Sequence, residues 1–227
     1  MTSSYDANVE RADLVRRFRT STRTIRVAER DVTLLSPANA DDLISEDDYV
    51  RDERLPYWAD LWPSARVLAN ELALMRLGGQ RVLELGCGLG VVALGAVLAG
   101  AEVTATDYYE DAPRFARLNV HAATGRQIAI RHVDWSALPE DLGRFDAVVA
   151  SDVLYEHRYA TLVANAIAAT LVRGGEAIVA DPGRIALPAF LEECGERGLV
   201  TEPDVRIFKE GEITQTITLH RVHWRSE

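Results

Sequence analysis

The chain has 227 residues, of which 48% are hydrophobic and 26% are charged, and its formal net charge is −10. This length and composition are typical of a soluble globular protein with one sizeable α/β domain and little chain left for a second. The negative charge opposes non-specific attraction to nucleic acid and to anionic membranes, so we expect neither as a partner.

Residues 1–55 are predicted to form an N-terminal extension that consists of a helix and a β-hairpin. Residues 9–19 have the pattern of a charged amphipathic helix, and residues 24–27 and 32–35 have that of two short paired strands. The acidic stretch 41–53 is expected to be a surface loop or a short helix.

Residues 56–227 are predicted to form the main domain. A helix begins at Pro63 and ends at Gly78-Gly79. After it, apolar strands are expected at 81–85, 102–106, 128–133, 145–150 and 176–180, and helices at 89–99, 110–122, 159–172 and 188–197. Such alternation predicts a doubly wound, mostly parallel sheet of the α/β class. Segments 205–209 and 213–223 read as a closing antiparallel hairpin, which brings the sheet to seven strands.

A glycine turn follows the strand at 81–85. Its glycines stand at alternate positions: Gly86, Gly88 and Gly90. Backbone without Cβ atoms can approach a ligand closely and can adopt positive φ. The dinucleotide fingerprint has the same order of elements, but it has a glycine where this chain has Val91. Glu84 also directs a carboxylate toward the turn, which suits a cationic ligand better than a pyrophosphate. A glycine-rich turn that binds no ligand is the alternative.

Acidic residues close the next two strands, where ligands of open α/β sheets bind. Asp107, followed by Tyr108, can accept hydrogen bonds from both hydroxyls of a ribose, although it can equally cap the next helix. Asp134, followed by Trp135, can accept from an adenine amino group, or it can simply serve a turn. The fourth strand ends in Ser151, next to the expected reactive end of a ligand.

The turn from Glu84 to Gly90 resembles motif I of the class I S-adenosylmethionine (SAM) methyltransferases. Residues 56–180 as a whole resemble the seven-strand protein lysine methyltransferases. The segments that carry this resemblance are 62–69, 84–90, 106–108, Asn119, 134–135 and 151–155. Residues 57–62 look most like the branch that modifies the electron-transfer flavoprotein β subunit. They also look like the bacterial, nicotinamide-methyltransferase-like relatives of that branch. Segment 181–184 departs from the better-known lysine enzymes.

The resemblance implies a Rossmann-like class I methyltransferase fold with SAM as cofactor. It implies that Trp62 contacts the cofactor from the side, and we expect Glu84 to serve its methionine end. The remaining cofactor-binding residues that we predict are Gly86, Gly88, Gly90, Asp107, Tyr108, Asp134, Trp135 and Ser151.

Asp152 and Tyr155 match the Asp-x-x-Tyr pattern of the family and are our predicted catalytic residues. Methyl transfer is an in-line displacement, in which positioning of the nucleophile accounts for much of the rate. Tyr155 is expected to orient the acceptor nitrogen, and Asp152 to stabilise the positive charge that passes from sulfur to nitrogen. In the alternative account, Ser151 or Asp152 only caps the following helix.

These observations predict an enzyme: a SAM-dependent N-methyltransferase that acts on a lysine side chain of a protein substrate. A small-molecule N- or O-methyltransferase and a non-catalytic SAM-binding module are the alternatives. DNA is disfavoured as a substrate because the loop after the fourth strand lacks the Asn/Asp-Pro-Pro-aromatic sequence of adenine methylases. The five histidines lack clustered ligand spacing, so no metal site is expected.

Cys87 and Cys194 are the only cysteines, too few for a disulfide framework. We see neither a signal peptide nor a membrane-spanning apolar run. A cytoplasmic, bacterial protein, with a monomer favoured, is the resulting expectation.

Overall fold

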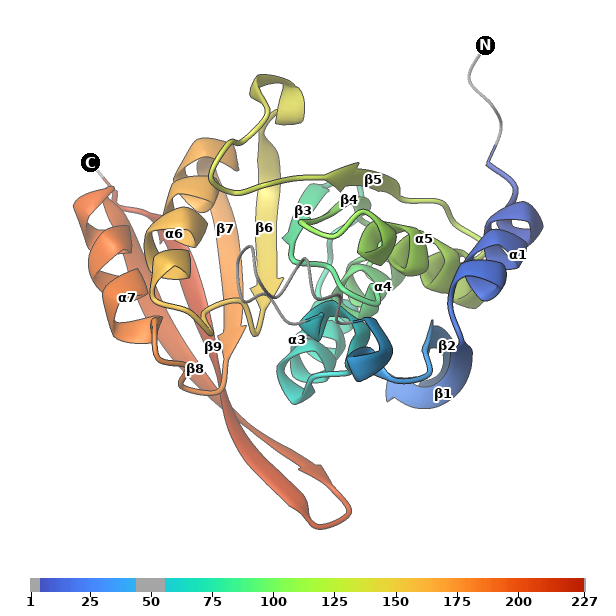
Figure 1. Cartoon of the computed structure of the whole chain (residues 1–227). Coiled ribbons are helices and arrows are strands. Elements are labelled where there is room, and N and C mark those ends of the chain that lie inside the picture. The colour runs from blue at the N-terminus through green and yellow to red at the C-terminus, as the bar shows by residue number, and fades with distance from the viewer. Residues whose placement is uncertain (1–4, 44–55, 227) are drawn as a thin grey trace.

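A seven-stranded sheet forms the centre of the computed structural model, which describes residues 5–43 and 56–226 (Figure 1). In sheet order the strands are β5 (Ala129–His132), β4 (Glu102–Asp107), β3 (Arg81–Leu85), β6 (Phe145–Ser151), β7 (Leu171–Asp181), β9 (Ile213–Trp224) and β8 (Leu199–Glu210). The first five are parallel, and β9 runs antiparallel to both of its neighbours. The predicted fold class is therefore confirmed. The chain turns from one half of the sheet to the other between β3 and β6, which is where ligands of such sheets bind.

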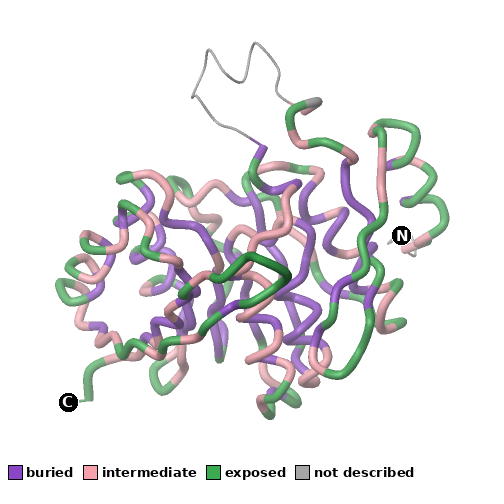
Figure 2. The backbone as a smooth tube through the Cα atoms, turned by 90° about the horizontal axis from the view of Figure 1, so that it is seen from below, coloured by how far each residue is buried: buried purple, intermediate pink, exposed green. Residues whose placement is uncertain are grey.

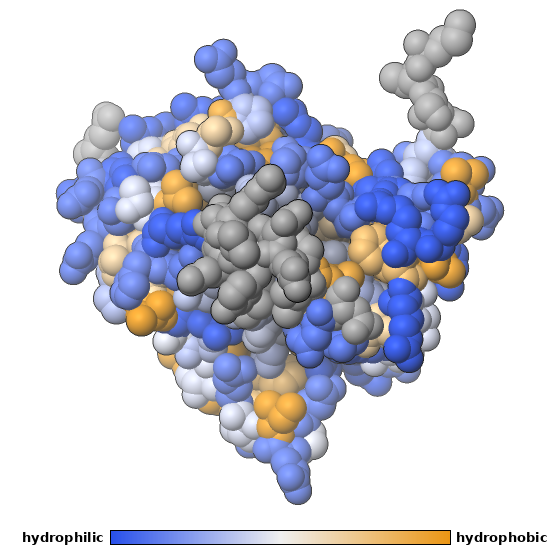
Figure 3. Space-filling view, viewed as in Figure 1, coloured by the Kyte–Doolittle hydropathy of each residue, from blue (hydrophilic) through white to orange (hydrophobic). Residues whose placement is uncertain are grey.

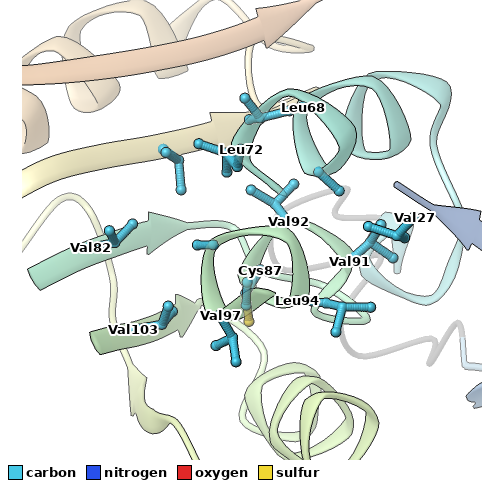
Figure 4. Packing of buried hydrophobic residues seen from close by; sticks show 14 of the residues in the cluster. Val27, Leu68, Leu72, Val82, Cys87, Val91, Val92, Leu94, Val97 and Val103 are labelled. Atoms are coloured by element: carbon cyan, nitrogen blue, oxygen red, sulfur yellow. The ribbon is translucent and has the colours of Figure 1, made fainter. Parts of the chain in front are cut away.

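Helices cover both faces of the sheet. α3 (Pro63–Leu74), α4 (Val91–Leu98) and α5 (Asp111–Thr124) lie on one face, and α6 (Arg158–Thr170) and α7 (Leu187–Glu196) on the other. Figure 4 shows side chains of α3 and α4 packed against those of β3 and β4. Figure 2 shows the buried backbone running through the middle of the molecule. This arrangement explains why the sequence of α4 is apolar all round.

Two differences from the predicted elements have clear physical causes. The helix expected from residue 89 begins at Val91, because residues 86–90 are used by the turn. β8 begins at Leu199 rather than at 205, and it contains Pro203. Proline interrupts the sequence signal of a strand, but the edge strand of a sheet tolerates it because one side of its backbone has no partner strand.

The β8–β9 hairpin extends past the end of its neighbour in the sheet. β7 stops at Asp181, which pairs with Thr218, so hairpin residues 205–217 extend beyond the end of β7. Phe208 and Ile217 stay buried in the core cluster, and the tip of the hairpin projects from the molecule. Its exposed apolar residues are Val205, Ile207 and Ile213, and orange surface is visible on this projection in Figure 3.

The N-terminal residues form α1 (Ala7–Arg17) and a hairpin of β1 (Thr20–Val27) and β2 (Arg30–Pro37). α1 begins two residues earlier than predicted because the Asp6 carboxylate accepts hydrogen bonds from the first turn. The apolar side chains of the hairpin join the core cluster of α4. Within the predicted acidic stretch, the short helix η1 (Ala40–Leu43) is present, and residues 44–53 lie outside the described residues. The division at residue 55 stays a prediction.

Among residues 5–43 and 56–226, no helix combines the length and the apolar character needed to cross a membrane.

Candidate active site

A cavity of ≈ 270 Å³ lies at the carboxyl ends of β3, β4 and β6. Eleven of the twelve predicted site residues line it: Trp62, Glu84, Gly86, Gly88, Asp107, Tyr108, Asp134, Trp135, Ser151, Asp152 and Tyr155. They gather there because the carboxyl ends of parallel strands share one edge of the sheet. Residues that are far apart in the sequence thus form one concave surface.

The glycines of the turn serve different purposes. All three have positive φ: 71° at Gly86, 46° at Gly88 and 79° at Gly90. A Cβ on Gly86 would lie 3.1 Å from a Val153 methyl group and 3.5 Å from the Trp135 ring, both of which belong to cavity-lining residues. At Gly90 a Cβ would lie 2.6 Å from the Cα of Ala116 on α5. Gly90 is not among the lining residues, and its small size serves the packing of α5 against the turn.

Glu84 brings a buried carboxylate to the cavity wall. The residue is 1% exposed, and its Oε2 has no hydrogen-bond partner among the described residues. Burial, and secondarily the neighbouring Asp107, raises the pKa of the Glu84 carboxyl well above its usual range, although a backbone hydrogen bond from Ala93 opposes the shift. A buried acceptor without a partner is costly unless a ligand supplies the donor. Glu84 therefore fits a ligand with a cationic or hydrogen-bond-donating group.

Asp107 connects the end of β4 to the glycine turn. Its Oδ2 accepts a hydrogen bond from the Gly88 backbone N–H at 3.0 Å, and its Oδ1 accepts one from the Tyr109 N–H at 3.1 Å. Burial raises the pKa of Asp107, and these backbone bonds counteract the rise. The residue at the N-cap of α5 is Glu110, so the alternative in which Asp107 caps this helix is wrong.

Asp134 and Trp135 follow β5 and line the cavity. The Asp134 Oδ1 accepts hydrogen bonds from the backbone N–H and the hydroxyl of Ser136, so this residue does order a turn, as the alternative interpretation predicts. Trp135 has a buried indole N–H without a partner in the described part of the chain. This donor lies on a cavity-lining residue and can serve a ligand acceptor.

The Asp-x-x-Tyr segment follows β6. Asp152 has a φ of 56°, a left-handed conformation that is uncommon for a residue with a side chain. α6 begins only at Arg158, with His157 at its N-cap and no side-chain capping bond. The alternative in which Ser151 or Asp152 caps that helix is therefore wrong. Asp152 instead contacts Arg184, whose Nε and Nη2 lie 2.9 and 2.8 Å from its Oδ1.

Tyr155 belongs to a row of aromatic rings on the cavity wall. Its ring centroid is 5.2 Å from that of Tyr57 and 4.9 Å from that of Tyr159. The row continues to Trp62 beyond Tyr57 and to Trp135 beyond Tyr159. The Tyr155 hydroxyl lies 3.5 Å from that of Tyr159. Burial is the largest cause of the raised pKa of Tyr155, so this hydroxyl keeps its proton at physiological pH.

The predicted site residues leave out three participants, Tyr57, Tyr159 and Arg184, although segments 57–62 and 181–184 were singled out from the sequence. Tyr159 follows Tyr155 by four positions, a spacing that places two side chains on one helical face. The spacing is uninformative here because Tyr155 precedes the helix. Arg184 lies in the segment that departs from the better-known lysine enzymes. Asn119, which carries part of the resemblance, does not line the cavity; its side chain hydrogen-bonds the backbone of Leu35 and of Leu89.

Metal-binding clusters of three or more histidine, cysteine or acidic residues do not occur in the described part of the chain. Both cysteines are buried free thiols.

Comparison with known proteins gives matches over the same region. A sequence model of the lysine methyltransferase family matches residues 57–181. The chain is 38% identical over 114 residues to protein N-lysine methyltransferase METTL21A of Danio rerio, a match that covers 45% of this chain and 50% of that protein. It is 30% identical over 138 residues to the electron transfer flavoprotein beta subunit lysine methyltransferase of Xenopus laevis, covering 57% and 53%. The chain thus spans about half the length of these curated relatives.

Among solved structures, magnesium protoporphyrin IX methyltransferase of Synechocystis, determined with bound SAM, is similar in fold. The TM-score is 0.59 at 20% identity, over 81% of this chain and 94% of that chain. The family match from 57 to 181 covers more than half of the 227 residues and includes both β3 with its glycine turn and the Asp-x-x-Tyr segment, so the chain belongs to the lysine methyltransferase family.

Proposed function

We propose that this protein transfers a methyl group from SAM to the side-chain amine of a lysine in a protein substrate. The observation that carries the proposal is the convergence of Glu84, Asp107 and the Asp152–Tyr155 segment on one cavity. Membership of the lysine methyltransferase family supports the acceptor. A cytoplasmic, monomeric bacterial enzyme is part of the same proposal, and two buried thiols without a disulfide agree with a reducing compartment.

The residues of the cavity fit SAM in charge and in hydrogen-bonding groups. Glu84 offers an unpartnered buried acceptor to the amino group of the methionine end, and Asp107 offers a carboxylate to the ribose. Trp135 offers an unpartnered N–H, and its flat ring lies 3.5 Å from the position that a Cβ on Gly86 would take. Bound SAM supplies a methyl group on a positively charged sulfur.

The chain's own residues then have to hold a neutral amine in line with that methyl group. A lysine in water carries a proton, since its ordinary pKa is about 10.4. Desolvation among the rings of Tyr57, Tyr155 and Tyr159 disfavours the ammonium form and so favours loss of this proton to water as the side chain enters. The bond from nitrogen to the methyl carbon would then form as the sulfur–methyl bond breaks, with S-adenosylhomocysteine as the leaving group. The Tyr155 hydroxyl orients the nitrogen, and the Asp152 carboxylate stabilises the positive charge that develops on it.

The test is incubation of the purified protein with tritium-labelled SAM and a lysate of the source cell. A labelled protein band that yields methyllysine on hydrolysis supports the proposal. The Asp107→Ala variant, in which SAM binding is expected to be weakened, is the control for contaminating activity.

Two other outcomes would overturn the lysine substrate. Label that appears only in the low-molecular-weight filtrate would assign a metabolite as acceptor. Calorimetric binding of S-adenosylhomocysteine without any labelled product would assign a non-catalytic SAM-binding module.

A further inference from the structure

The side chain of Asp152 is placed by contacts from outside the cavity. Its backbone N–H donates to the Ala180 carbonyl at 3.0 Å, and its Oδ1 is held by the Nε and Nη2 atoms of Arg184. Residues with side chains persist at positive φ only where the surroundings over-determine the conformation. Asp152 has a φ of 56°, and its contacts with Ala180 and Arg184 stabilise this conformation.

Both contacts from Arg184 are to one carboxylate oxygen: Nε donates a hydrogen bond to Oδ1, and Nη2 lies at ion-pair distance from the same atom. The second oxygen, Oδ2, makes no hydrogen bond with the described residues, and Asp152 lines the cavity while Arg184 does not. The arrangement therefore fixes the carboxylate through Oδ1 and leaves Oδ2 for a substrate group. Arginine suits this task because its planar guanidinium presents Nε and Nη2 in a rigid geometry.

Arg184 is itself held in place. The Oδ1 of Asp181, a residue with 0% exposure, accepts hydrogen bonds from the backbone N–H groups of Gly183 and Arg184, both at 2.7 Å. The guanidinium carbon of Arg184 lies 5.2 Å from the ring centroid of Trp62. The loop after β7 thus connects a buried carboxylate, a cation and a cavity-lining indole.

We infer that Arg184 is a positioning residue for methyl transfer, which sets the conformation of Asp152 and, through Oδ2, the placement of the acceptor amine. The inference rests on the proposed function for its catalytic consequence. The sequence 181–184, which departs from the better-known lysine enzymes, acquires a role in this way: its aspartate orders the loop and its arginine orders Asp152.

The test compares Arg184→Gln and Arg184→Lys with Arg131→Gln, a matched control. Arg131 has a similar side-chain exposure, 35% against 33%, and it pairs with Asp141 at 2.8 Å outside the cavity. In the labelled-SAM assay with lysate, we expect Arg184→Gln to lower the initial rate about 10- to 100-fold, the cost of a misplacement near 1 Å. Arg184→Lys should recover part of the rate, and Arg131→Gln should retain it.

A double-mutant cycle separates positioning from general stability. In an Asp152→Ala background, the further change Arg184→Gln should alter the rate less than about twofold, because the carboxylate through which Arg184 acts has gone. Affinity for S-adenosylhomocysteine, measured by calorimetry, should stay within about twofold of wild type in Arg184→Gln, since Arg184 is not a lining residue. If Arg184→Gln lowered the rate by the same factor in the wild-type background and in the Asp152 variant, the inference would be overturned.

A crystal structure of Arg184→Gln with S-adenosylhomocysteine decides the question without any acceptor. Displacement of the Asp152 carboxylate supports the inference, and an unmoved carboxylate overturns it. If the wild-type protein labels no acceptor, the proposed function fails, whereas this structural result still decides what Arg184 does. If Arg184→Gln does not fold, the same structure is determined for Arg184→Lys, with the same two outcomes.

Discussion

The carboxylate of Asp107 accepts a hydrogen bond from the backbone N–H of Gly88 at 3.0 Å, across nineteen positions of sequence. The acid that ends β4 and the turn that follows β3 therefore form one unit on the cavity wall. Because β3 and β4 are parallel and paired in register, Leu85 lies beside Thr106, and the residues that follow each strand emerge next to each other. The binding edge is built by strand pairing rather than by any single motif.

Replacement of Asp107 should weaken cofactor binding. Asp107→Ala removes the acceptor for the Gly88 and Tyr109 N–H groups as well as the carboxylate expected to bind the ribose. Hydrogen bonds to a charged group contribute about 1.5–3 kcal/mol, so affinity for S-adenosylhomocysteine should fall by at least about tenfold. Calorimetry measures this directly. Asp111→Ala, which changes an acid of α5 outside the cavity, should leave the affinity unaltered, and equal affinities of all three proteins would refute the ribose role.

Removal of the Glu84 charge should have opposite effects on stability and on binding. Burial raises the folded-state pKa of Glu84, so its contribution to stability is fully present below the ordinary carboxyl pKa and is lost as the pH rises through the folded-state value. Glu84→Gln should therefore raise the unfolding temperature of the ligand-free protein at pH 8, by about 2–4 °C for each kcal/mol gained. The gain should shrink toward pH 5.

The same variant should bind S-adenosylhomocysteine about tenfold or more weakly, because a neutral amide replaces the partner of a cationic amino group. Scanning calorimetry with and without the ligand measures both effects. Glu102→Gln, an exposed glutamate at the opposite end of β4, serves as the control. A variant that is less stable than wild type at pH 8 would contradict the assignment of Glu84 as a costly buried acceptor.

Loss of the Tyr155 hydroxyl should affect turnover more than binding. Tyr155→Phe keeps the ring between Tyr57 and Tyr159 and removes only the oxygen that lies 3.5 Å from the Tyr159 hydroxyl. One hydrogen bond to the acceptor corresponds to roughly a tenfold lower kcat, with S-adenosylhomocysteine affinity within about twofold. Steady-state kinetics and calorimetry separate the two quantities. Equal losses in both would indicate a structural role, and Tyr5→Phe, outside the cavity, should change neither.

An alanine at Gly90 should destabilise the fold rather than the site. Gly125, with φ at 69° and open space around it, is the matched control: Gly125→Ala should cost about 1–2 kcal/mol for the left-handed conformation alone. Gly90→Ala should cost a further 1–3 kcal/mol, roughly, because its Cβ would lie 2.6 Å from Ala116. Urea unfolding measures the difference. If Gly90→Ala were as stable as Gly125→Ala but bound S-adenosylhomocysteine poorly, Gly90 would be a cofactor-binding residue, as the sequence predicted.

Local sequence determined the scaffold and one edge of the site. β3 is observed at Arg81–Leu85, as predicted. A short apolar run that is followed by glycine is typical of a buried strand in an α/β chain. The acids at Asp107 and Asp134 could be assigned to the binding edge from the sequence alone, since each directly follows a predicted strand and parallel strands end at a common edge. Sequence periodicity and turn chemistry are local properties, so they were enough to predict the strands and the acids at their ends.

Only the tertiary structure decided which side chains meet across that edge. Arg184 reaches Asp152 over thirty-two positions, and the aromatic row joins Trp62, just before α3, to Trp135, after β5. Neither contact has a periodic signature, because each depends on how two separate loops fold over the ends of the strands. Sequence thus specified the strands and the residues at their ends, whereas the packing of distant loops specified how the reactive end is enclosed and held.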